Sequence, residues 1–454
     1  MIVVKFGGTS VQDTSAVLRA AEVVRGRLSR RPVVVVSALG GATNALLAIA
    51  EQASQGHLIS ALSAVEGLRD RHLRTAEELL AEAPSAQAAD VMADLSATFD
   101  ELASLAEALS VLGHVTPRSM DAIAAKGEML SSELVVAAFR ARDIPATHVN
   151  AMHVMVTGEQ YGRAEPLPER IAEAARRHVR PLVERGEVPV LGGFVGATEL
   201  GIVTTLGRGG SDYSASLFGA ALGADAIEIW TDVDGMLTAD PRVVPDAQLI
   251  ERIGFDEASE LASFGAKVLH PSTIAPAVRL GIPVYIYNSR NPSGRGTQIT
   301  FDAPVRDVRA IAGKQGVTVV KVRSPRMLLA HGFLRTVFEI FDKHRTSIDV
   351  VATSEVSVSL TVDDATHLDG LVVDLSQLGD VSVERNRGIV ALVGANLGNS
   401  SEAMSRALAA ISPMKVHMLS LSASGINLTI LVDGDQVAPA MRALHRAFFG
   451  VSND

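Results

Sequence analysis

The chain has 454 residues and no cysteine, which at about 150 residues per domain suggests three domains and excludes a disulfide framework or a thiol nucleophile. Hydrophobic residues make up 47% and charged residues 20%, as in a globular protein. With 41 Lys and Arg against 51 Asp and Glu, the net charge of −10 disfavours nucleic-acid binding. The N-terminus has no basic leader and no apolar run approaches the ~20 residues of a membrane span, so we expect a cytoplasmic protein without a membrane partner.

Short apolar strands alternate with helices over the first 300 residues. Helical spacing of Val17, Leu18, Ala21 and Val24 predicts the first helix, and a loop over 37–44 precedes a second at Ala45–Gln55. Strands are predicted at Ile2–Phe6, Val33–Val36, Val188–Leu191, Ala226–Trp230 and Val284–Tyr287. This alternation indicates an α/β sandwich with a largely parallel sheet.

Residues 58–140 have a different composition, since Gly and Pro are scarce and Ala, Leu, Glu and Arg dominate. Leucines recur there at helical spacing, which predicts a helical insertion within the α/β domain, with a lid as one possible role.

A third pattern begins near residue 305, where strands and helices occur in an order that is repeated once. Ser354–Val362 aligns with Ser424–Val432 at an offset of 70 residues, which indicates a paired module of two α+β units. Two unrelated α+β domains are the alternative. The strands are predicted at Val317–Val322, Ile348–Ala352, Val356–Val362, Ile389–Val393, Val416–Leu421 and Ile426–Val432, and the helices at Phe333–His344 and Glu402–Ile411.

Four small-residue turns follow predicted strands or their continuations, in the segments 5–10, 37–41, 192–194 and 206–212. Glycines at the carboxyl ends of strands let main-chain N–H groups approach an anion. Together with Lys5 and Arg208, the turns favour a site for phosphate and carboxylate groups. Neither GxxxxGK[ST] nor GxGxxG is present, which disfavours a P-loop nucleotidase and a Rossmann dehydrogenase.

Five motifs in this order resemble the aspartate kinases: KFGGTS at the N-terminus, KGEMLSS at 126–132, TTLGRGGSDYSA at 204–215, WTDVDGMLTADPR at 230–242 and FGAKVLHP at 264–271. The segments MLLAHGFL and SIDVVATSEVSVSLT resemble the ACT module of the lysine-sensitive subclass. The resemblance covers nearly the whole chain. It implies an amino-acid-kinase (carbamate-kinase-like) α/β/α domain over residues 1–304, interrupted by the insertion, and two ACT domains over 305–386 and 387–454.

The reaction implied by the resemblance is the transfer of phosphate from ATP, with Mg²⁺, to the side chain of L-aspartate. It is the first step of lysine, threonine and methionine biosynthesis. The acceptor carboxylate is already ionised at neutral pH, so no general base is needed. Stabilising charge on the transferring phosphoryl group is the main task. Lys5 with Gly7 and Gly8 would hold the phosphates, and Asp212 would orient Lys5. The alternatives are a solvated lysine at a strand end and an N-cap aspartate.

The resemblance assigns the α-carboxylate of aspartate to Arg208 and its ammonium to Glu128, with hydroxyl groups from Ser37, Thr43 and Ser211. For Glu128 the pattern alone favours a surface charge on a helix. The resemblance also assigns ATP to Thr231, Asp232, Leu237, Arg242, Lys267 and Val268. Leu237 stands where the family usually has tyrosine, so a hydroxyl contact to the nucleotide is in doubt. No protein ligand for Mg²⁺ is identified.

An allosteric amino acid, expected to be lysine rather than threonine, would bind residues that match effector positions of the subclass: Met327, Gly332, Ser347, Asp349, Thr353, Ser354 and Glu355. Asp349 and Glu355 could bind the two ammonium groups of lysine, although the same residues could form a polar loop without a ligand. ACT domains usually pair across subunits, so a homodimer is expected, with a tetramer as the alternative. Two other functions stay open: another carboxylate kinase of this fold, such as a glutamate kinase, and an inactive amino-acid sensor.

Overall fold

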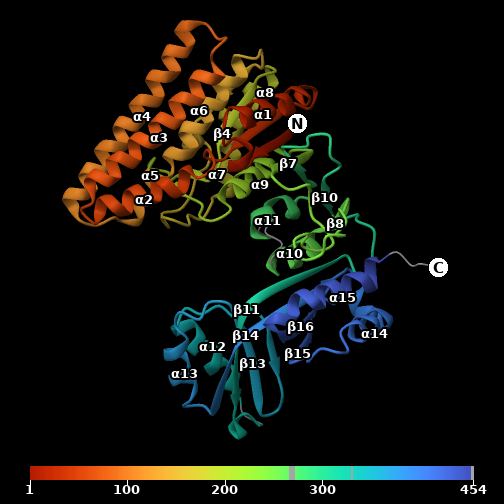
Figure 1. Ribbon diagram of the computed structural model, residues 1–454. Helices are drawn as coiled ribbons and strands as arrows, with labels where there is room; N and C mark the ends of the chain where they lie inside the picture. Colours follow the sequence, from red (N-terminus) through yellow and green to blue (C-terminus); the bar gives the residue numbers. More distant parts are fainter. Residues whose placement is uncertain (265–270, 329–330, 451–454) are drawn as a thin grey trace. The chain divides into compact units, whose positions relative to one another are not determined.

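The computed structural model describes residues 1–264, 271–328 and 331–450, and the chain divides into two compact units (Figure 1). The first unit contains Met1–Met236 and Val268–Phe301. The second contains Leu237–Lys267 and Asp302–Asp454. The sequence predicted a single boundary at residue 304. The second unit begins close to that position, at Asp302, but it also includes the earlier segment Leu237–Lys267. Among the described helices, none has the length and apolar character needed to span a membrane.

A largely parallel sheet forms the centre of the first unit. The strands of this sheet that belong to the first unit pair in the order β3 (Ala146–His148), β4 (Val188–Gly192), β2 (Pro32–Val36), β1 (Ile2–Phe6), β7 (Ala226–Thr231), β9 (Val284–Asn288) and β10 (Thr297–Thr300). Neighbours from β3 to β9 are parallel, and β10 is antiparallel to β9. Strands β1 and β2 are buried along their whole length, as their continuous β-branched runs predict. The five strands predicted for this region are confirmed.

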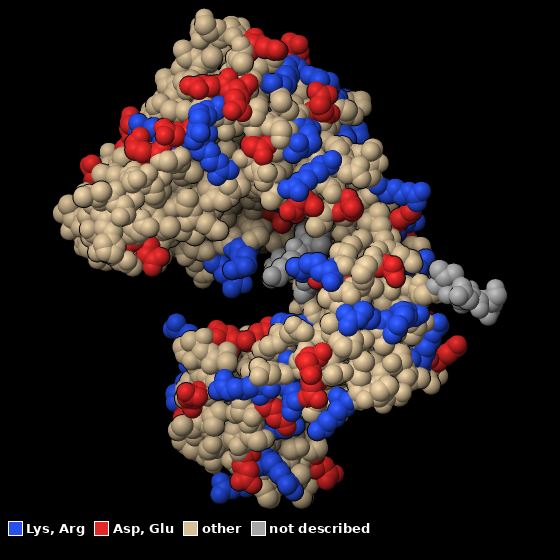
Figure 2. Space-filling model, viewed as in Figure 1, with Lys and Arg blue, Asp and Glu red and all other residues tan. Residues whose placement is uncertain are grey.

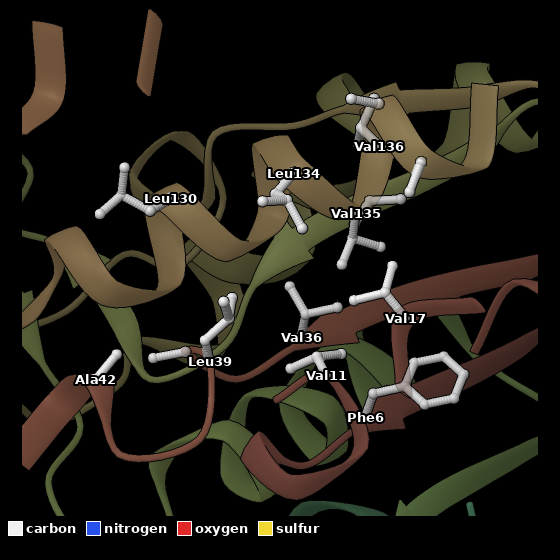
Figure 3. Packing of buried hydrophobic residues seen from close by; sticks show 14 of the residues in the cluster. Phe6, Val11, Val17, Val36, Leu39, Ala42, Leu130, Leu134, Val135 and Val136 are labelled. Carbon is white, nitrogen blue, oxygen red and sulfur yellow. The ribbon is translucent and has the colours of Figure 1, made fainter. Parts of the chain in front are cut away.

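Helices cover the sheet and form one hydrophobic core with it. That core includes side chains from α1 (Thr14–Arg25), α2 (Ala42–Ser54), α3 (Leu58–Leu79), α4 (Ser85–Leu112), α5 (Pro117–Ala124) and α6 (Lys126–Arg140). Helices α3 to α6 are the predicted helical insertion. Helix α2 begins three residues earlier than predicted, because Gly41 adopts a φ of +82° and serves as its N-cap. Figure 3 shows Leu134 and Val135 on the side of α6 that faces Val36 and Val17.

The remaining elements of the first unit are helices and a short hairpin. Helix α9 contacts β1, β2 and β7, and both α7 and α11 pack beside α9. The elements are α7 (Pro168–His178), α8 (Arg180–Glu184), α9 (Gly210–Leu222), α11 (Pro271–Arg279) and the hairpin of β5 (Val195–Ala197) and β6 (Val203–Thr205).

One six-stranded sheet forms the second unit. Its order is β12 (Val351–Thr353), β13 (Ser357–Val362), β11 (Ala310–Arg323), β14 (Asp380–Val393), β16 (Asn427–Asp433) and β15 (Met418–Leu421), and all neighbours are antiparallel. The unit also contains α10 (Phe255–Ser263), α12 (Phe333–Lys343), α13 (Leu368–Leu375), α14 (Ser401–Ala410) and α15 (Val437–Phe449).

The offset found in the sequence also relates the two central strands. Strand β14 begins and ends 70 residues after β11 (380 − 310 and 393 − 323), and β16 begins 70 residues after β13 (427 − 357). The paired repeat is therefore present in the fold. The predicted boundary at 386/387 falls inside β14, at a bend where Asn386 has a φ of +57°.

Candidate functional site

The carboxyl ends of the parallel strands meet at one edge of the first sheet. From β1 the chain continues to β2 on one side, whereas β7, which adjoins β1 on the other side, is followed by β9. Strand order therefore reverses between β1 and β7, and open α/β sheets bind ligands at such a point. Three of the four predicted turns follow strands β1, β2 and β4, and the common edge of the sheet is the physical reason why these three lie together. The fourth turn follows β6 of the separate hairpin.

Hydrogen bonds connect the loops after β1, β7 and β9. Ser10 Oγ lies 3.1 Å from Trp230 O and 2.8 Å from Ser289 Oγ, and the Ser289 hydroxyl donates to Thr231 O at 3.0 Å. Ser10 is buried and Ser289 is 4% exposed. These two serines were not among the predicted site residues. They fix the loop that contains Gly7 and Gly8 relative to the end of β7.

The glycine loops present unused main-chain donors. Within the described part of the chain, the N–H groups of Gly8, Thr9, Gly40 and Gly41 make no hydrogen bond. Gly8, Thr9 and Gly40 are half-buried, and half-buried N–H groups normally have partners, so their free donors at the strand ends indicate space for an anion. This is the feature that the glycine pattern predicted.

Lys5 forms an ion pair with Asp212 at this edge. The distance from Lys5 Nζ to Asp212 Oδ1 is 2.7 Å, and the lysine side chain is 8% exposed. Lys5 Nζ also lies 3.4 Å from the position that a Cβ on Gly7 would take. The alternative of a solvated lysine is therefore wrong. Asp212 lies in the first turn of α9, whose N-cap is Gly209, so the N-cap alternative is wrong as well.

Glu128 is a buried carboxyl group in the first turn of α6. The residue is 3% exposed, and its Oε2 atom has no hydrogen-bond partner among the described residues. Burial raises the pKa of Glu128 to about 8, and this effect outweighs main-chain donors at Ala38 and Glu128 itself and the charge of Lys5. A surface charge on a helix is excluded. A buried acid that has one unpartnered oxygen beside the glycine loops is suited to receive a cation.

Close approaches between elements require glycine at several positions of the site. A Cβ on Gly192 would lie 3.1 Å from Glu128 Cβ, and one on Gly193 would lie 2.7 Å from Ser211 Cβ. The end of β4 therefore lies against both the start of α6 and the start of α9. A Cβ on Gly127 would lie 4.0 Å from Thr43 Oγ1. The structure thus brings together the predicted substrate residues Thr43, Glu128 and Ser211.

Arg208 and Ser37 complete the set of predicted substrate residues. Arg208 is exposed in the loop that leads into α9, and its side chain has no hydrogen-bond or ion-pair partner within the described residues. Ser37 directly follows β2, and its carbonyl accepts a hydrogen bond from Ser131 Oγ at 2.8 Å. Ser131 lies within the KGEMLSS motif, but its contact with the loop after β2 was not predicted.

The predicted ATP-binding residues fall into three groups. Thr231 and Asp232 lie at the end of β7 in the first unit. Leu237 and Arg242 belong to the second unit, where Arg242 is paired with Asp240 at 2.6 Å. Lys267 and Val268 lie outside the described residues. A nucleotide-binding role for these six residues stays a prediction.

The predicted effector residues lie in the second unit, on either side of β12. Ser347 and Asp349 precede this strand, and Thr353, Ser354 and Glu355 lie at its end and in the turn to β13. Met327 and Gly332 lie after β11, and Ser324, at the start of that segment, donates its N–H to Val356 O at 2.8 Å. Two groups result: Met327 shares one end of the sheet with Thr353–Glu355, and Ser347 and Asp349 lie at the other end of β12.

Asp349 belongs to a cluster of three charged groups. Its Oδ2 lies 3.9 Å from Lys314 Nζ, and Lys314 also pairs with Asp363. Burial and a hydrogen bond with Asp363 raise the pKa of Asp349 to about 6, although Lys314 acts in the opposite direction. A positively charged group that approached Asp349 would therefore compete with Lys314 for this carboxyl group.

Asp121 is a buried carboxylate that sequence reasoning missed. It is 2% exposed and accepts hydrogen bonds from Thr205 N–H at 3.0 Å, Thr205 Oγ1 at 2.6 Å and Gly162 N–H at 2.9 Å. These bonds join α5 to the end of β6, just before the loop that contains Arg208. Its partners are far away in the sequence, so no local pattern could reveal this role.

The described residues contain no cluster of three or more His, Cys, Asp or Glu side chains arranged to hold a metal ion. On the face shown in Figure 2, acidic and basic side chains are interspersed on each unit. That face shows no continuous positive area among the described residues.

Comparisons with known proteins agree with this geometry. The amino acid kinase family matches residues 1–288, and an ACT domain matches residues 390–448. The lysine-sensitive aspartokinase 3 of Escherichia coli (strain K12) is 37% identical over 460 residues, which cover 99% of both chains.

Two solved structures of E. coli aspartokinase III are also similar over nearly the whole chain. The complex with lysine and aspartate, described as the T-state, has a TM-score of 0.83 and 36% identity and covers 99% of each chain. The complex with aspartate and ADP, described as the R-state, has a TM-score of 0.84 and 36% identity, and covers 99% of this chain and 100% of that one.

Proposed function

This chain belongs to the aspartokinases, and on that premise we propose that it transfers the γ-phosphoryl group of ATP to the side-chain carboxylate of L-aspartate. The products would be ADP and 4-phospho-L-aspartate. The observation that carries the proposal is the pair of the buried Lys5 with the half-buried Asp212, beside glycine loops with free N–H groups. These groups form a positively polarised edge at the point where the strand order reverses.

The chemistry fits such an edge. The attacking carboxylate of aspartate has an ordinary pKa of about 3.9 and needs no base at neutral pH. Its attack on the γ-phosphorus brings two anions together, so the protein has to offset their repulsion and the charge on the transferring group. Lys5 would donate hydrogen bonds to the phosphate oxygens together with the Gly7–Gly8 segment, and Asp212 would hold the lysine in place.

Aspartate would be gripped by groups at the start of α6 and α9. Arg208, which is exposed and without a partner in the described chain, can form a bidentate pair with the α-carboxylate. Glu128 can receive the α-ammonium, and the arriving positive charge would ionise its carboxyl group. Ser37, Thr43 and Ser211 would supply hydroxyl groups.

ATP would bind near the end of β7, where Thr231 and Asp232 lie. Leu237, Arg242, Lys267 and Val268 belong to the same proposed nucleotide site, as the family resemblance implies. Mg²⁺ would enter with the nucleotide on its phosphate oxygens and would reduce the negative charge that the acceptor meets. We assign it no dedicated protein ligand.

Feedback inhibition by lysine is the regulatory part of the proposal. The relative with 37% identity is named for lysine sensitivity, and the second unit has the paired repeat of an amino-acid sensor. Asp349 and Glu355 would bind ammonium groups of the effector, with Met327, Gly332, Ser347, Thr353 and Ser354 around it. Assembly as a homodimer through the edges of this sheet is part of the same proposal.

A hydroxamate assay for acyl phosphates tests the proposal. The purified chain is incubated with ATP, Mg²⁺ and either L-aspartate or L-glutamate, in the presence or absence of lysine or threonine. We expect product with aspartate and inhibition by lysine. Product with glutamate alone would indicate another carboxylate kinase of this fold, and no product with any amino acid would indicate an inactive sensor.

A further inference from the structure

We infer that Arg71, on helix α3 of the helical insertion, is a positioning residue that holds together the two glycine loops of the candidate active site. No sequence motif pointed to this residue. The inference rests on the proposed kinase reaction, because the two loops are the ones that would contact its phosphate and aspartate groups.

One guanidinium group bridges the two loops. Arg71 Nη1 donates to Gly40 O at 2.8 Å, and Arg71 Nη2 donates to Gln12 O at 2.9 Å. Gly40 belongs to the loop after β2, and Gln12 belongs to the loop that follows β1. The planar fork of an arginine fixes the directions of both donors at once, which a flexible ammonium group cannot do.

The hydrogen bond to Gly40 also fixes the direction of a free donor. The Gly40 carbonyl and the Gly41 N–H belong to the same trans peptide plane and point in opposite directions. Because the Gly40 carbonyl points toward its donor Arg71, the Gly41 N–H is directed away from Arg71 and from α3. This N–H is one of the donors that make no hydrogen bond within the described residues.

The two loops are also in direct contact. A Cβ on Gly40 would lie 2.9 Å from Gln12 Cβ and 3.3 Å from Gly8 O. A shift of either loop would therefore displace the other. The two hydrogen bonds of Arg71 connect these touching loops to helix α3.

Helix α3 is a rigid support for the arginine. Its buried residues, which include Ala61, Val65 and Leu68, belong to the main core of the first unit. His72, which follows Arg71, is fully buried, and its ring packs against the ring of Phe99 with centroids 5.3 Å apart. The insertion thus braces the active-site loops from a fixed position, a role different from that of a moving lid.

Arg74 provides a matched control one turn along the same helix. Both arginines line a surface hollow of about 450 Å³ beside the start of α1. Arg74 Nε donates to Asp70 O of its own helix at 3.2 Å, and its side chain has no bond to either loop in the described chain. Arg71→Ala should lower kcat/KM by at least about tenfold, because small displacements of binding groups are costly to catalysis. Arg74→Ala should stay within about twofold of the wild type.

Two further measurements separate positioning from a general loss of structure. Guanidinium chloride, at concentrations too low to unfold the chain, should restore part of the activity of Arg71→Ala and should not affect Arg74→Ala. Hydrogen exchange should become faster in peptides that contain Gly8 and Gly41 in Arg71→Ala, with unchanged exchange in the second unit. Arg71→Lys, which retains the charge but not the fork, should fall between wild type and alanine.

The outcomes distinguish this inference from the proposed function. Wild-type kcat/KM in Arg71→Ala, or a loss equal to that of Arg74→Ala, would overturn the positioning role while leaving the kinase activity intact. A loss of activity without guanidinium rescue and without faster loop exchange would overturn it too. If the wild-type chain itself formed no acyl phosphate, the proposed function would fail, whereas the exchange experiment would still report whether Arg71 holds the loops.

Discussion

Lys5 is the residue whose charge matters most to the proposed reaction. Replacement by Met keeps most of the buried aliphatic chain and removes the ammonium group that faces Asp212. We predict that Lys5→Met lowers kcat at least about a hundredfold, since one preorganised charge on a transferring phosphoryl group contributes several kcal/mol. Steady-state kinetics by the hydroxamate assay, with circular dichroism to confirm folding, checks this. Near-normal turnover would remove Lys5 from the chemistry.

Glu128 should make aspartate binding depend on pH. Its pKa of about 8 means that the free site holds a neutral carboxyl at pH 7 and an anion above pH 8. The substrate ammonium prefers the anion, so KM for aspartate should fall as the pH rises through about 8, while KM for ATP should change little. Glu128→Gln should abolish this dependence. Arg208→Ala is the contrasting variant, because it should raise KM for aspartate and leave the pH dependence in place.

The raised pKa of Glu128 also makes the free energy of unfolding depend on pH, in a direction that can be predicted. Its pKa in the fold lies above the ordinary value of 4.5, so its contribution to folding is full below that pH and is lost as the pH rises through about 8. The wild type should therefore lose stability relative to Glu128→Gln in alkaline solution. Urea unfolding at pH 6 and pH 9 measures this difference, and an equal difference at the two pH values would contradict the assignment.

Residue by residue, the sequence was informative where a functional group lies beside a glycine turn, as Lys5 and Asp212 do. It could not reveal Arg71 or Asp121, because each acts on main-chain atoms that are distant in the sequence. Arg71 is 59 residues from Gln12, and Asp121 is 84 residues from Thr205. Contacts of this kind follow from packing and leave no mark in local patterns.

At the scale of elements, the connection between α5 and β6 depends on Asp121. Four hydrogen bonds from Gly162 and Thr205 satisfy its buried carboxylate. Asp121→Asn introduces an N–H group where only acceptors fit, so we predict a loss of roughly 1–3 kcal/mol in the free energy of unfolding. The exposed Asp90→Asn should change it by less than about 0.5 kcal/mol. Urea denaturation compares the two variants, and equal midpoints would contradict the prediction.

Element types were predicted well because their patterns are strong. The buried runs that form β1 and β2 have no competing interpretation. Element ends were less accurate. Strand β11 extends from Ala310 to Arg323, well beyond the predicted Val317–Val322, since Gly313, Lys314 and Gln315 pair with β14 although they are not typical strand residues. Tertiary pairing overrides intrinsic preference at such positions.

At the scale of the whole molecule, inhibition requires that the second unit alter the first. We predict that Asp349→Ala or Glu355→Ala weakens inhibition by lysine about 5- to 150-fold, the usual range of allosteric coupling, with little change in uninhibited kcat. A ligand shifts an equilibrium only by its differential affinity for the two states, so losing one charged contact reduces the shift. Dose–response curves for lysine and threonine test this, and strong inhibition by threonine alone would refute it.

The division into units could not be predicted from composition. Residues 237–264 come after strand β7 in the sequence, yet they belong to the same compact unit as the C-terminal sheet. Thr238 Oγ1 lies 2.9 Å from His445 Nε2, and the buried Glu257 pairs with Arg309 at 3.3 Å and accepts a hydrogen bond from Ala395 N–H at 3.0 Å. The partners are separated by 52 to 207 residues, and nothing in the intervening sequence signals the association.

The two long central strands of the C-terminal sheet, β11 and β14, limit how the second unit can evolve. Strand β11 pairs with β14 along nearly its full length, and each also pairs with one strand of its own repeat, β11 with β13 and β14 with β16. Loss of either 70-residue copy would expose the unpaired edge of the other, which favours aggregation. Point changes can give each copy a different ligand preference, or none. Point substitutions can therefore change the ligand specificity of this unit during evolution. Neither repeat can be lost or replaced independently of the other, because the two share one sheet.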